Sequence, residues 1–222
     1  MEEQKQYIIS TAISLFLRYN FKIVSMDFIA QEGRISKKTI YKHFRNKEHL
    51  IEEALMEIGH RIQKQFTKVS SEKHNSVEAL YNIFYVTFIY PSSEISSFYY
   101  SLKQYSINKY GLFYSILINM LYVNTKSQIE KGIANGVFIP QIEAQDFCLL
   151  LTSLMQGIRL KIESFPQFNH KDATALIANA IYYSLRSVVT VKGLELLEMM
   201  EIDTTYHWSL LNSELIEPQT IM

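Results

Sequence analysis

The sequence predicts an all-α protein, and three observations carry this prediction. The 222 residues include only seven glycines and four prolines, and no Asn-Gly or Asp-Gly pair joins two alternating runs as in a β-hairpin. Apolar residues recur instead at spacings of three and four, which is the period of amphipathic helices. With 48% apolar and 20% charged residues, the chain has enough apolar material for a packed core.

The first helix is expected from about Glu3 to Tyr19. Ile9, Ile13 and Phe16 recur at helical spacing in this stretch and form one apolar stripe. Asn20 follows, and we expect it to end the helix because asparagine tolerates the left-handed backbone conformation.

Two short helices come next, separated by a tight turn. Ser25 can cap a second helix, Met26–Glu32, in which Asp27 faces the positive end of the helix dipole. Gly33-Arg34-Ile35 is predicted to form a three-residue turn. Ser36 then caps a third helix of about eight residues.

The rest of the chain is predicted to form longer helices. Asn46 caps a fourth, long helix that begins at Lys47. Further helices are expected near residues 76–90, 93–107, 110–135, 144–165 and 170–192. The breaks between them are marked by Pro91, Gly136 with Pro140, and Pro166. Residues 194–222 are expected to hold one more short helix and a frayed end.

Charge divides the chain into a basic head and an acidic body, although Lys plus Arg and Asp plus Glu both total 22. Residues 1–50 hold nine basic and five acidic side chains, whereas residues 51–222 hold thirteen and seventeen. This asymmetry is typical of a chain whose basic segment faces nucleic acid.

The basic residues concentrate around the third predicted helix, since residues 34–47 contain six basic side chains and no acidic one. A helix of about eight residues is ~12 Å long, comparable with the ~12 Å width of the DNA major groove. Its groove-facing side offers Lys37, Lys38, Thr39 and Lys42. Lysines there can neutralise phosphates or donate to guanine, and a threonine can contact thymine. A solvated lysine surface is the alternative interpretation, but the coincidence with two capped helices favours DNA binding.

Residues 8–50 resemble the DNA-binding domain of the TetR family of bacterial transcriptional regulators. The matching segments are Ala12-Ile13-Ser14-Leu15-Phe16, Phe28-Ile29-Ala30, Ile35-Ser36-Lys37-Lys38-Thr39-Ile40-Tyr41-Lys42-His43-Phe44 and Asn46-Lys47-Glu48-His49-Leu50. The resemblance implies a three-helix helix-turn-helix DNA-binding domain at residues 1–47. It also implies a larger helical bundle at residues 48–222 for ligand binding and dimerisation.

The same resemblance assigns roles to single residues. Ser25, Tyr41 and Lys47 would contact DNA phosphates, and the third helix would read the bases. Core positions would be Ile29, Ala30, Ile35, Ile40 and Phe44. The full set of expected DNA-binding residues is Ser25, Arg34, Ser36, Lys37, Lys38, Thr39, Tyr41, Lys42 and Lys47.

The turn before the third helix departs from the family pattern. The family usually has Ala-Gly there, whereas this chain has Gly33-Arg34, with the glycine one place early. Either the left-handed position stays at residue 34, where arginine costs on the order of 1 kcal/mol relative to glycine, or the turn has shifted. The two alternatives place Arg34 differently against DNA.

Aromatic residues crowd the middle of the chain: residues 81–122 contain thirteen of its 29 aromatic residues, nine of them tyrosines. Tyrosine combines apolar area with a hydroxyl that needs a partner when buried. An aromatic core is one interpretation, and a cavity for a small organic ligand is the other. The resemblance favours the cavity, because TetR-family proteins hold their inducer pocket among the middle helices. The expected wall residues are Tyr85, Phe88, Tyr105, Phe113 and Tyr114.

The helices near residues 144–165 and 170–192 carry more apolar residues than one buried face needs, for example Leu149 to Leu151 and Ile181 to Tyr183. Excess apolar helix surface is usually covered by another chain. By the resemblance, these two helices pair with a second protomer. An extended core within one chain is the alternative.

Sequence motifs of enzymes and metal sites are absent: the chain has no GxGxxG or Walker loop, HExxH or Gly-x-Ser-x-Gly. Its single cysteine, Cys148, lies among apolar residues and is expected to be buried in the core. We therefore expect no enzymatic activity, no cofactor and no metal.

Membrane and export signals are also absent from the sequence. The longest strongly apolar stretch, Leu112 to Val123, has twelve residues, short of the ~20 that span a bilayer. The first residues lack the basic and apolar run of a secretory signal. We expect a cytoplasmic protein with no membrane partner.

These features predict a homodimeric, TetR-type transcriptional repressor that binds a palindromic operator. Its expected partners are double-stranded operator DNA, a second copy of the chain, and a small apolar or aromatic ligand that releases the DNA. The alternative is a helical small-molecule or lipid-binding protein without sequence-specific DNA binding.

Overall fold

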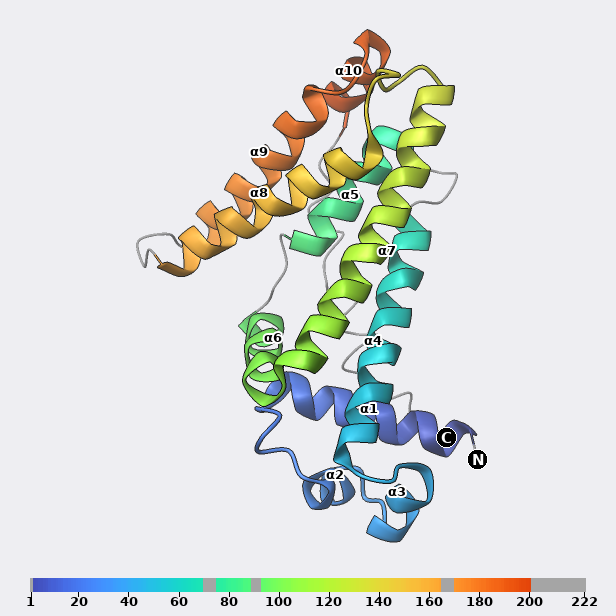
Figure 1. The fold of residues 1–222 in the computed structure, drawn as a ribbon, viewed down its shortest axis with the longest axis vertical. Coiled ribbons are helices and arrows are strands. Elements are labelled where there is room, and N and C mark those ends of the chain that lie inside the picture. The colour runs from blue at the N-terminus through green and yellow to red at the C-terminus, as the bar shows by residue number, and fades with distance from the viewer. Residues whose placement is uncertain (1, 70–74, 89–92, 165–169, 201–222) are drawn as a thin grey trace. The chain divides into compact units, whose positions relative to one another are not determined.

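The computed structural model describes residues 2–69, 75–88, 93–164 and 170–200 (Figure 1). These residues form ten helices, and their only β pairing is an isolated bridge between Phe138 and Val189. The helices are α1 (Glu2–Arg18), α2 (Met26–Glu32), α3 (Lys37–His43), α4 (Lys47–Val69), α5 (Ser76–Phe88), α6 (Ser93–Tyr105), α7 (Ile107–Ala134), α8 (Ala144–Ser164), α9 (His170–Arg186) and α10 (Val191–Glu198). The all-α prediction is confirmed. Residues 201–222, with the predicted frayed end, and the predicted breaks at Pro91 and Pro166 lie outside the described residues.

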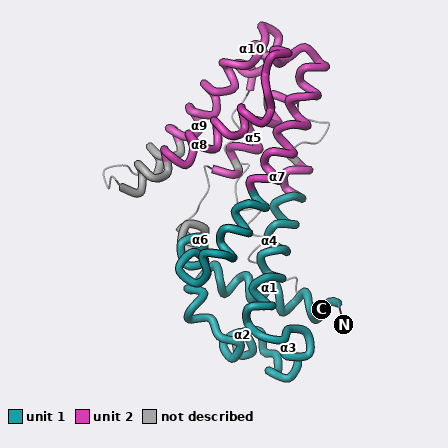
Figure 2. The backbone as a smooth tube through the Cα atoms, viewed as in Figure 1, with its two compact units in different colours: residues 1–64, 91–117, 207–222 teal, residues 65–90, 118–206 magenta. Residues whose placement is uncertain are grey.

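The chain divides into two compact units (Figure 2). Of the described residues, 2–64 and 93–117 form unit 1, and 65–69, 75–88, 118–164 and 170–200 form unit 2. Unit 1 therefore contains α1, α2, α3 and α6 with the first parts of α4 and α7. Unit 2 contains α5, α8, α9 and α10 with the remainder of α4 and α7. The expected functional boundary after residue 47 is a different division and stays a prediction.

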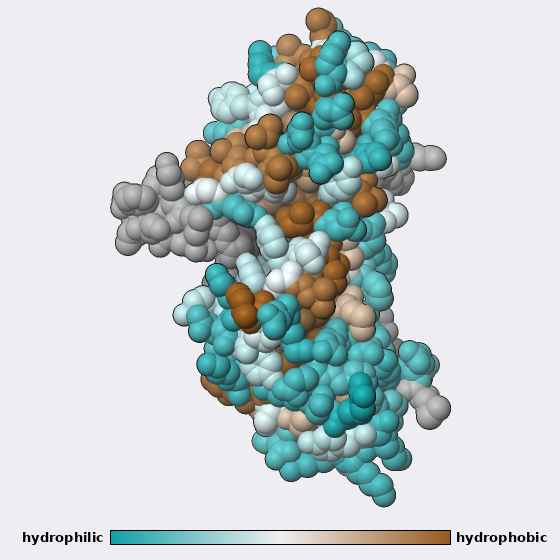
Figure 3. Space-filling view, in the orientation of Figure 1, coloured by the Kyte–Doolittle hydropathy of each residue, from teal (hydrophilic) through white to brown (hydrophobic). Residues whose placement is uncertain are grey.

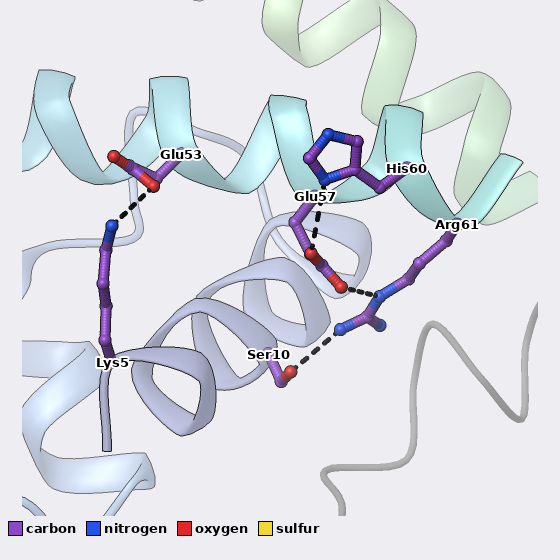
Figure 4. A network of polar contacts seen from close by, with 6 residues as sticks. All are labelled: Lys5, Ser10, Glu53, Glu57, His60 and Arg61. Atoms are coloured by element: carbon purple, nitrogen blue, oxygen red, sulfur yellow. Dashed lines mark hydrogen bonds and ion pairs between the residues drawn. The ribbon is translucent and has the colours of Figure 1, made fainter. Parts of the chain in front are cut away.

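Polar side chains join α1 to α4 within unit 1 (Figure 4). Lys5 pairs with Glu53 at 2.9 Å, and the guanidinium of Arg61 donates to the Ser10 hydroxyl at 2.9 Å. Arg61 also pairs with Glu57, one turn earlier on α4, at 2.7 Å. These partly buried contacts fix the direction in which α4 leaves the helix-turn-helix.

The core of unit 2 is built around α5, as its nearly uniform apolar sequence predicts. Phe84 is fully buried and meets Phe147 of α8 edge-on, with ring centroids 6.2 Å apart. Cys148 is 3% exposed, which confirms its predicted burial. Burial raises the pKa of its thiol.

The ninth helix is shorter than predicted. It ends at Arg186 rather than near residue 192, and a separate helix, α10, begins at Val191. The residues between them pair with the segment after α7: Thr190 donates its backbone N–H to the Val137 carbonyl at 3.0 Å, and the Thr190 hydroxyl caps α10. The apolar pattern continues through this break, so helical periodicity alone could not reveal it.

The end of α1 also differs in detail from the prediction. Asn20 ends the helix, but its backbone is not left-handed, because Arg34 is the one non-glycine residue with positive φ in the described part of the chain. The Asn20 side chain instead accepts a hydrogen bond from the Lys22 N–H at 2.8 Å. This is an Asx turn, the other way in which asparagine reverses a chain.

No helix in the described ranges is both long enough and apolar enough to span a lipid bilayer.

Candidate nucleic-acid interface

Two serine caps define where α2 and α3 begin. The Ser25 hydroxyl accepts from the Phe28 N–H at 3.1 Å, and the Ser36 hydroxyl accepts from the Thr39 N–H at 3.0 Å. Both serines have extended backbones, as N-cap residues do. The predicted caps are confirmed, and they orient the first turns of both helices.

The turn between the helices keeps its left-handed position at residue 34. Arg34 has φ of +50°, whereas Gly33 has φ of −76° and is right-handed. Gly33 is needed for space instead, because a Cβ there would lie 3.0 Å from the Ile29 carbonyl oxygen and 2.8 Å from the Ile35 side chain. The alternative of a shifted turn is therefore wrong, and arginine carries the conformational cost.

Buried residues fix the face that α3 turns outward. Ile40 and Phe44 have no exposed surface, and Ile29 of α2 is equally buried, as the core prediction requires. Ile35 is only half-buried. Because residues on the opposite side of a helix point away from its buried side, α3 presents a polar face to solvent. That exposed face holds Lys37, Lys38, Tyr41 and Lys42.

The side chains on this face are not equally available. Within the described part of the chain, Lys38 and Lys42 make no ion pair or hydrogen bond through their ammonium groups. Tyr41 is 52% exposed. The Thr39 hydroxyl lies 2.8 Å from that of Ser36, so it belongs to the cap of its own helix. A hydroxyl can both donate and accept, so Thr39 retains a capacity for one further contact.

Lys37, the first residue of α3, is paired with an acid on α2. Its ammonium lies 2.7 Å from the carboxylate of Asp27, and both side chains are well exposed, at 58% and 64%. From the sequence, Asp27 was expected only to face the positive end of the helix dipole. Its position in the first turn of α2 was visible in the sequence. The ion pair with Lys37, however, depends on how α2 and α3 pack against each other.

Lys47, the first residue of α4, points into the protein. Its ammonium donates to the Phe21 carbonyl oxygen and lies 4.9 Å from the centre of the Tyr105 ring. Burial lowers the pKa of Lys47, and the neighbouring charge of Glu48 partly offsets this effect. A contact between Lys47 and a DNA phosphate stays a prediction, and it would require Lys47 to leave these partners.

Two contacts tie the α6–α7 junction to the first two turns of α4, all within unit 1. The Tyr105 hydroxyl donates to Glu48 at 2.8 Å, and Lys109 pairs with Glu52 at 2.5 Å. The hydrogen bond from Tyr105 holds the pKa of Glu48 below its ordinary value. Burial, and then this bond, raise the pKa of Tyr105 to about 12. Sequence reasoning missed these pairs, whose members are 57 residues apart.

The residues expected to line a ligand pocket are distributed over both units. Tyr105, Phe113 and Tyr114 belong to unit 1, and Tyr85 and Phe88 belong to unit 2. Phe113 is 2% exposed and Tyr85 is 6% exposed, whereas the other three are half-buried. Their assignment to a pocket wall stays a prediction.

Aromatic contacts surround these positions in each unit. In unit 1, Phe113 meets Phe98 edge-on, with ring centroids 6.2 Å apart. In unit 2, Tyr85 stacks on Tyr81 at 5.7 Å. Tyr81 is 1% exposed, and its hydroxyl has no hydrogen-bond partner among the described residues.

The helix-turn-helix segment is similar in sequence to known proteins. Residues 8–54 match the family model described as bacterial regulatory proteins, tetR family. The HTH-type transcriptional regulator YhgD of Bacillus subtilis strain 168 is 35% identical over 51 residues, which are 23% of this chain and 27% of that protein. The segment from residue 8 to residue 54 is therefore a TetR-family helix-turn-helix.

Solved structures extend the likeness to most of the chain's length. A transcriptional regulator from Saccharomonospora viridis, solved in complex with choline, is 20% identical with a TM-score of 0.69, covering 86% of this chain and 100% of the other. SmeT of Stenotrophomonas maltophilia, solved with triclosan, is 12% identical with a TM-score of 0.64, covering 85% and 92%. At these identities the likeness is one of fold. The match to YhgD, by contrast, spans about a quarter of that relative.

The described residues hold no group of three or more His, Cys, Asp and Glu side chains placed to bind a metal ion.

Proposed function

We propose that this TetR-family chain is a homodimeric transcriptional repressor that binds a palindromic operator and is released by a small apolar or aromatic ligand. One observation carries the DNA-binding part. Ile40 and Phe44 fix α3 in the core, and this leaves Lys38, Tyr41 and Lys42 on its exposed face. Side chains so placed can reach base edges and phosphates when α3 enters the major groove.

The proposed contacts fall into two groups. Residues that face solvent can meet DNA directly, whereas Lys37 and Lys47 must first release Asp27 and Phe21. The directly available group is Ser25, Arg34, Ser36, Lys38, Thr39, Tyr41 and Lys42. We assign phosphate contacts to Ser25 and Tyr41, and base contacts to the other α3 side chains.

Helices α8 and α9 are the proposed dimer surface. Leu149, Leu150 and Leu154 of α8 are 63%, 71% and 46% exposed, and Tyr183 of α9 is 65% exposed. Hydrophobic residues gather over this helix pair in Figure 3. Contiguous exposed apolar surface of this kind is usually covered by a partner, and a two-fold dimer covers the same patch on both copies.

The ligand part of the proposal rests on the middle helices. The fold neighbours named above were solved with small organic molecules, choline in one case and triclosan in the other. Among the residues whose burial the structure describes, no Asp, Glu, Lys or Arg is buried, which favours a ligand whose binding needs no buried counter-charge. The buried Tyr81 hydroxyl, which lacks a described partner, is available to a ligand acceptor.

A route for release of DNA is provided by the contacts at the start of α4. Tyr105 and Lys109 hold Glu48 and Glu52, so a shift of the α6–α7 junction would alter the first turns of α4. A ligand that prefers the shifted arrangement must weaken DNA binding by reciprocal linkage.

Selection of bound sequences from random DNA tests the proposal. The purified protein should return a palindrome with half-sites about 34–36 Å apart, and its affinity should fall linearly with salt on a log–log plot. Lys38→Ala should change the preferred bases. Retention of all sequences alike would contradict operator binding and favour a ligand-binding protein without sequence-specific DNA recognition.

A further inference from the structure

The Asp27–Lys37 pair lies at the entrance to the proposed DNA interface. Asp27 is the second residue of α2 and Lys37 the first residue of α3, so the pair joins the two N-terminal turns of the helix-turn-helix. Each turn is held by its own serine cap, Ser25 or Ser36. The carboxylate is therefore placed by the fold beside a lysine on the exposed face of α3.

A carboxylate on Lys37 takes the place that a DNA phosphate would otherwise take, since both are anions that accept from an ammonium group. Exposed ion pairs of this kind are weak, at about 0–1 kcal/mol, so the pair can open. Opening it against a phosphate nevertheless brings the Asp27 carboxylate close to the negative backbone. Asp27 thus hinders Lys37 from binding phosphate on DNA sequences to which the protein is held by phosphate contacts alone.

We propose that Asp27 is a specificity-determining residue, which withholds Lys37 from phosphate contacts and so weakens non-operator binding more than operator binding. This inference rests on the proposed operator-binding function. Binding to non-operator DNA depends almost entirely on phosphate neutralisation by lysine and arginine. At the operator, base contacts by neighbours such as Lys38 and Lys42 hold α3 in place, so Lys37 can exchange Asp27 for a phosphate there and operator binding is weakened less.

The test is the salt dependence of non-operator binding by the full-length protein. Asp27→Asn should steepen the log–log slope by about 0.9 for each protomer, because one more phosphate is neutralised. At about 0.1 M salt the ratio of operator to non-operator affinity should fall by about 3- to 10-fold. Titrations use one random-sequence duplex and the palindrome recovered by selection.

A double-mutant cycle isolates the pair. Lys37→Gln alone should leave the non-operator slope unchanged, because Asp27 already occupies Lys37. In the Asp27→Asn background the same change should remove the added slope of about 0.9. Glu32→Gln at the other end of α2 changes the charge of the head equally and should have no such effect.

If Glu32→Gln steepened the slope equally, the effect would come from the net charge of the head and the inference would be overturned. An unchanged slope for Asp27→Asn would also overturn it. Circular dichroism verifies that each variant is folded. The outcome is separable from the proposed function: a wild-type protein that selects no sequence refutes operator binding, whereas the cycle on random DNA still reports whether Asp27 restrains Lys37.

Discussion

Replacing Arg34 by glycine should stabilise the turn between α2 and α3. Arg34 has φ of +50°, a region that costs an L-residue about 1–2 kcal/mol and glycine nothing. Glycine has more freedom in the unfolded chain, which costs about 0.5–1 kcal/mol. The net gain in the free energy of unfolding should therefore be about 0.5–1 kcal/mol. In a chain of this size, each kcal/mol raises the melting temperature by about 2–4 °C.

Arg34→Ala provides the matched control. Alanine removes the same charged side chain but keeps a Cβ at the left-handed position, so its stability should stay close to that of the wild type. Urea denaturation followed by circular dichroism compares the three proteins. Equal stability of the glycine and alanine variants would refute the assignment of strain to Arg34. Since both variants lose the charge, they should flatten the salt slope of DNA binding equally if Arg34 contacts a phosphate.

Three further predictions concern the body of the molecule and its link to the head. Gly193→Ala should destabilise the protein by about 1–3 kcal/mol in urea, because its Cβ would lie 2.1 Å from the Val137 carbonyl oxygen. Tyr105→Phe should remove the bond to Glu48 and cost about 1 kcal/mol. Folding raises the pKa of Tyr105 from 10 to about 12, so the folded state holds this proton more tightly than the unfolded state. Wild-type stability should therefore decrease as the pH rises from 10 to 12, and the variant should lack this decrease. Leu150→Asp, at a site 71% exposed, should halve the mass measured by light scattering.

Each of these predictions has a control variant or an outcome that would contradict it. Gly111→Ala, where no atom would lie within 4 Å of the new Cβ, should instead stabilise α7 by about 0.5–1 kcal/mol. A pH profile of Tyr105→Phe that matches the wild type would contradict the raised pKa. Gln145→Asp adds the same charge as Leu150→Asp at an exposed polar position on α8 and should leave the mass unchanged. An unchanged mass for Leu150→Asp would contradict the proposed dimer surface.

Local signals explain why the helix-turn-helix could be predicted in detail. A serine cap acts within three residues, as at Ser25 and Ser36. The burial of Ile40 and Phe44 was implied by the resemblance to the TetR family, and the structure confirms it. The left-handed residue at Arg34 was one of two stated alternatives, because the sequence shows where glycine is missing but not whether the backbone moves to follow it.

Contacts between distant segments could not be predicted in this way. Lys47 meets a carbonyl 26 residues away, at Phe21, and Tyr105 meets Glu48 across 57 residues. Neither pairing leaves a periodic trace in the sequence, because each depends on how helices pack. The same limit applies to the end of α9, where a bridge to the segment after α7 interrupts an apolar pattern that continues unbroken.

The internal partners of Lys37 and Lys47 change what the basic cluster should do on DNA. If all six basic residues from 34 to 47 neutralised phosphates, a dimer would show a log–log salt slope of about −11, at about −0.9 for each contact. Asp27 holds one of these lysines, and Phe21 with Tyr105 holds another, so four contacts for each protomer remain and the expected slope is about −7. Titration of wild-type protein on random-sequence DNA between 50 and 200 mM salt measures this slope, over roughly the range where such contacts have their largest effect. A slope near −11 would mean that both lysines leave their partners to contact phosphates, and the charge count of the sequence would then be the better guide to the interface.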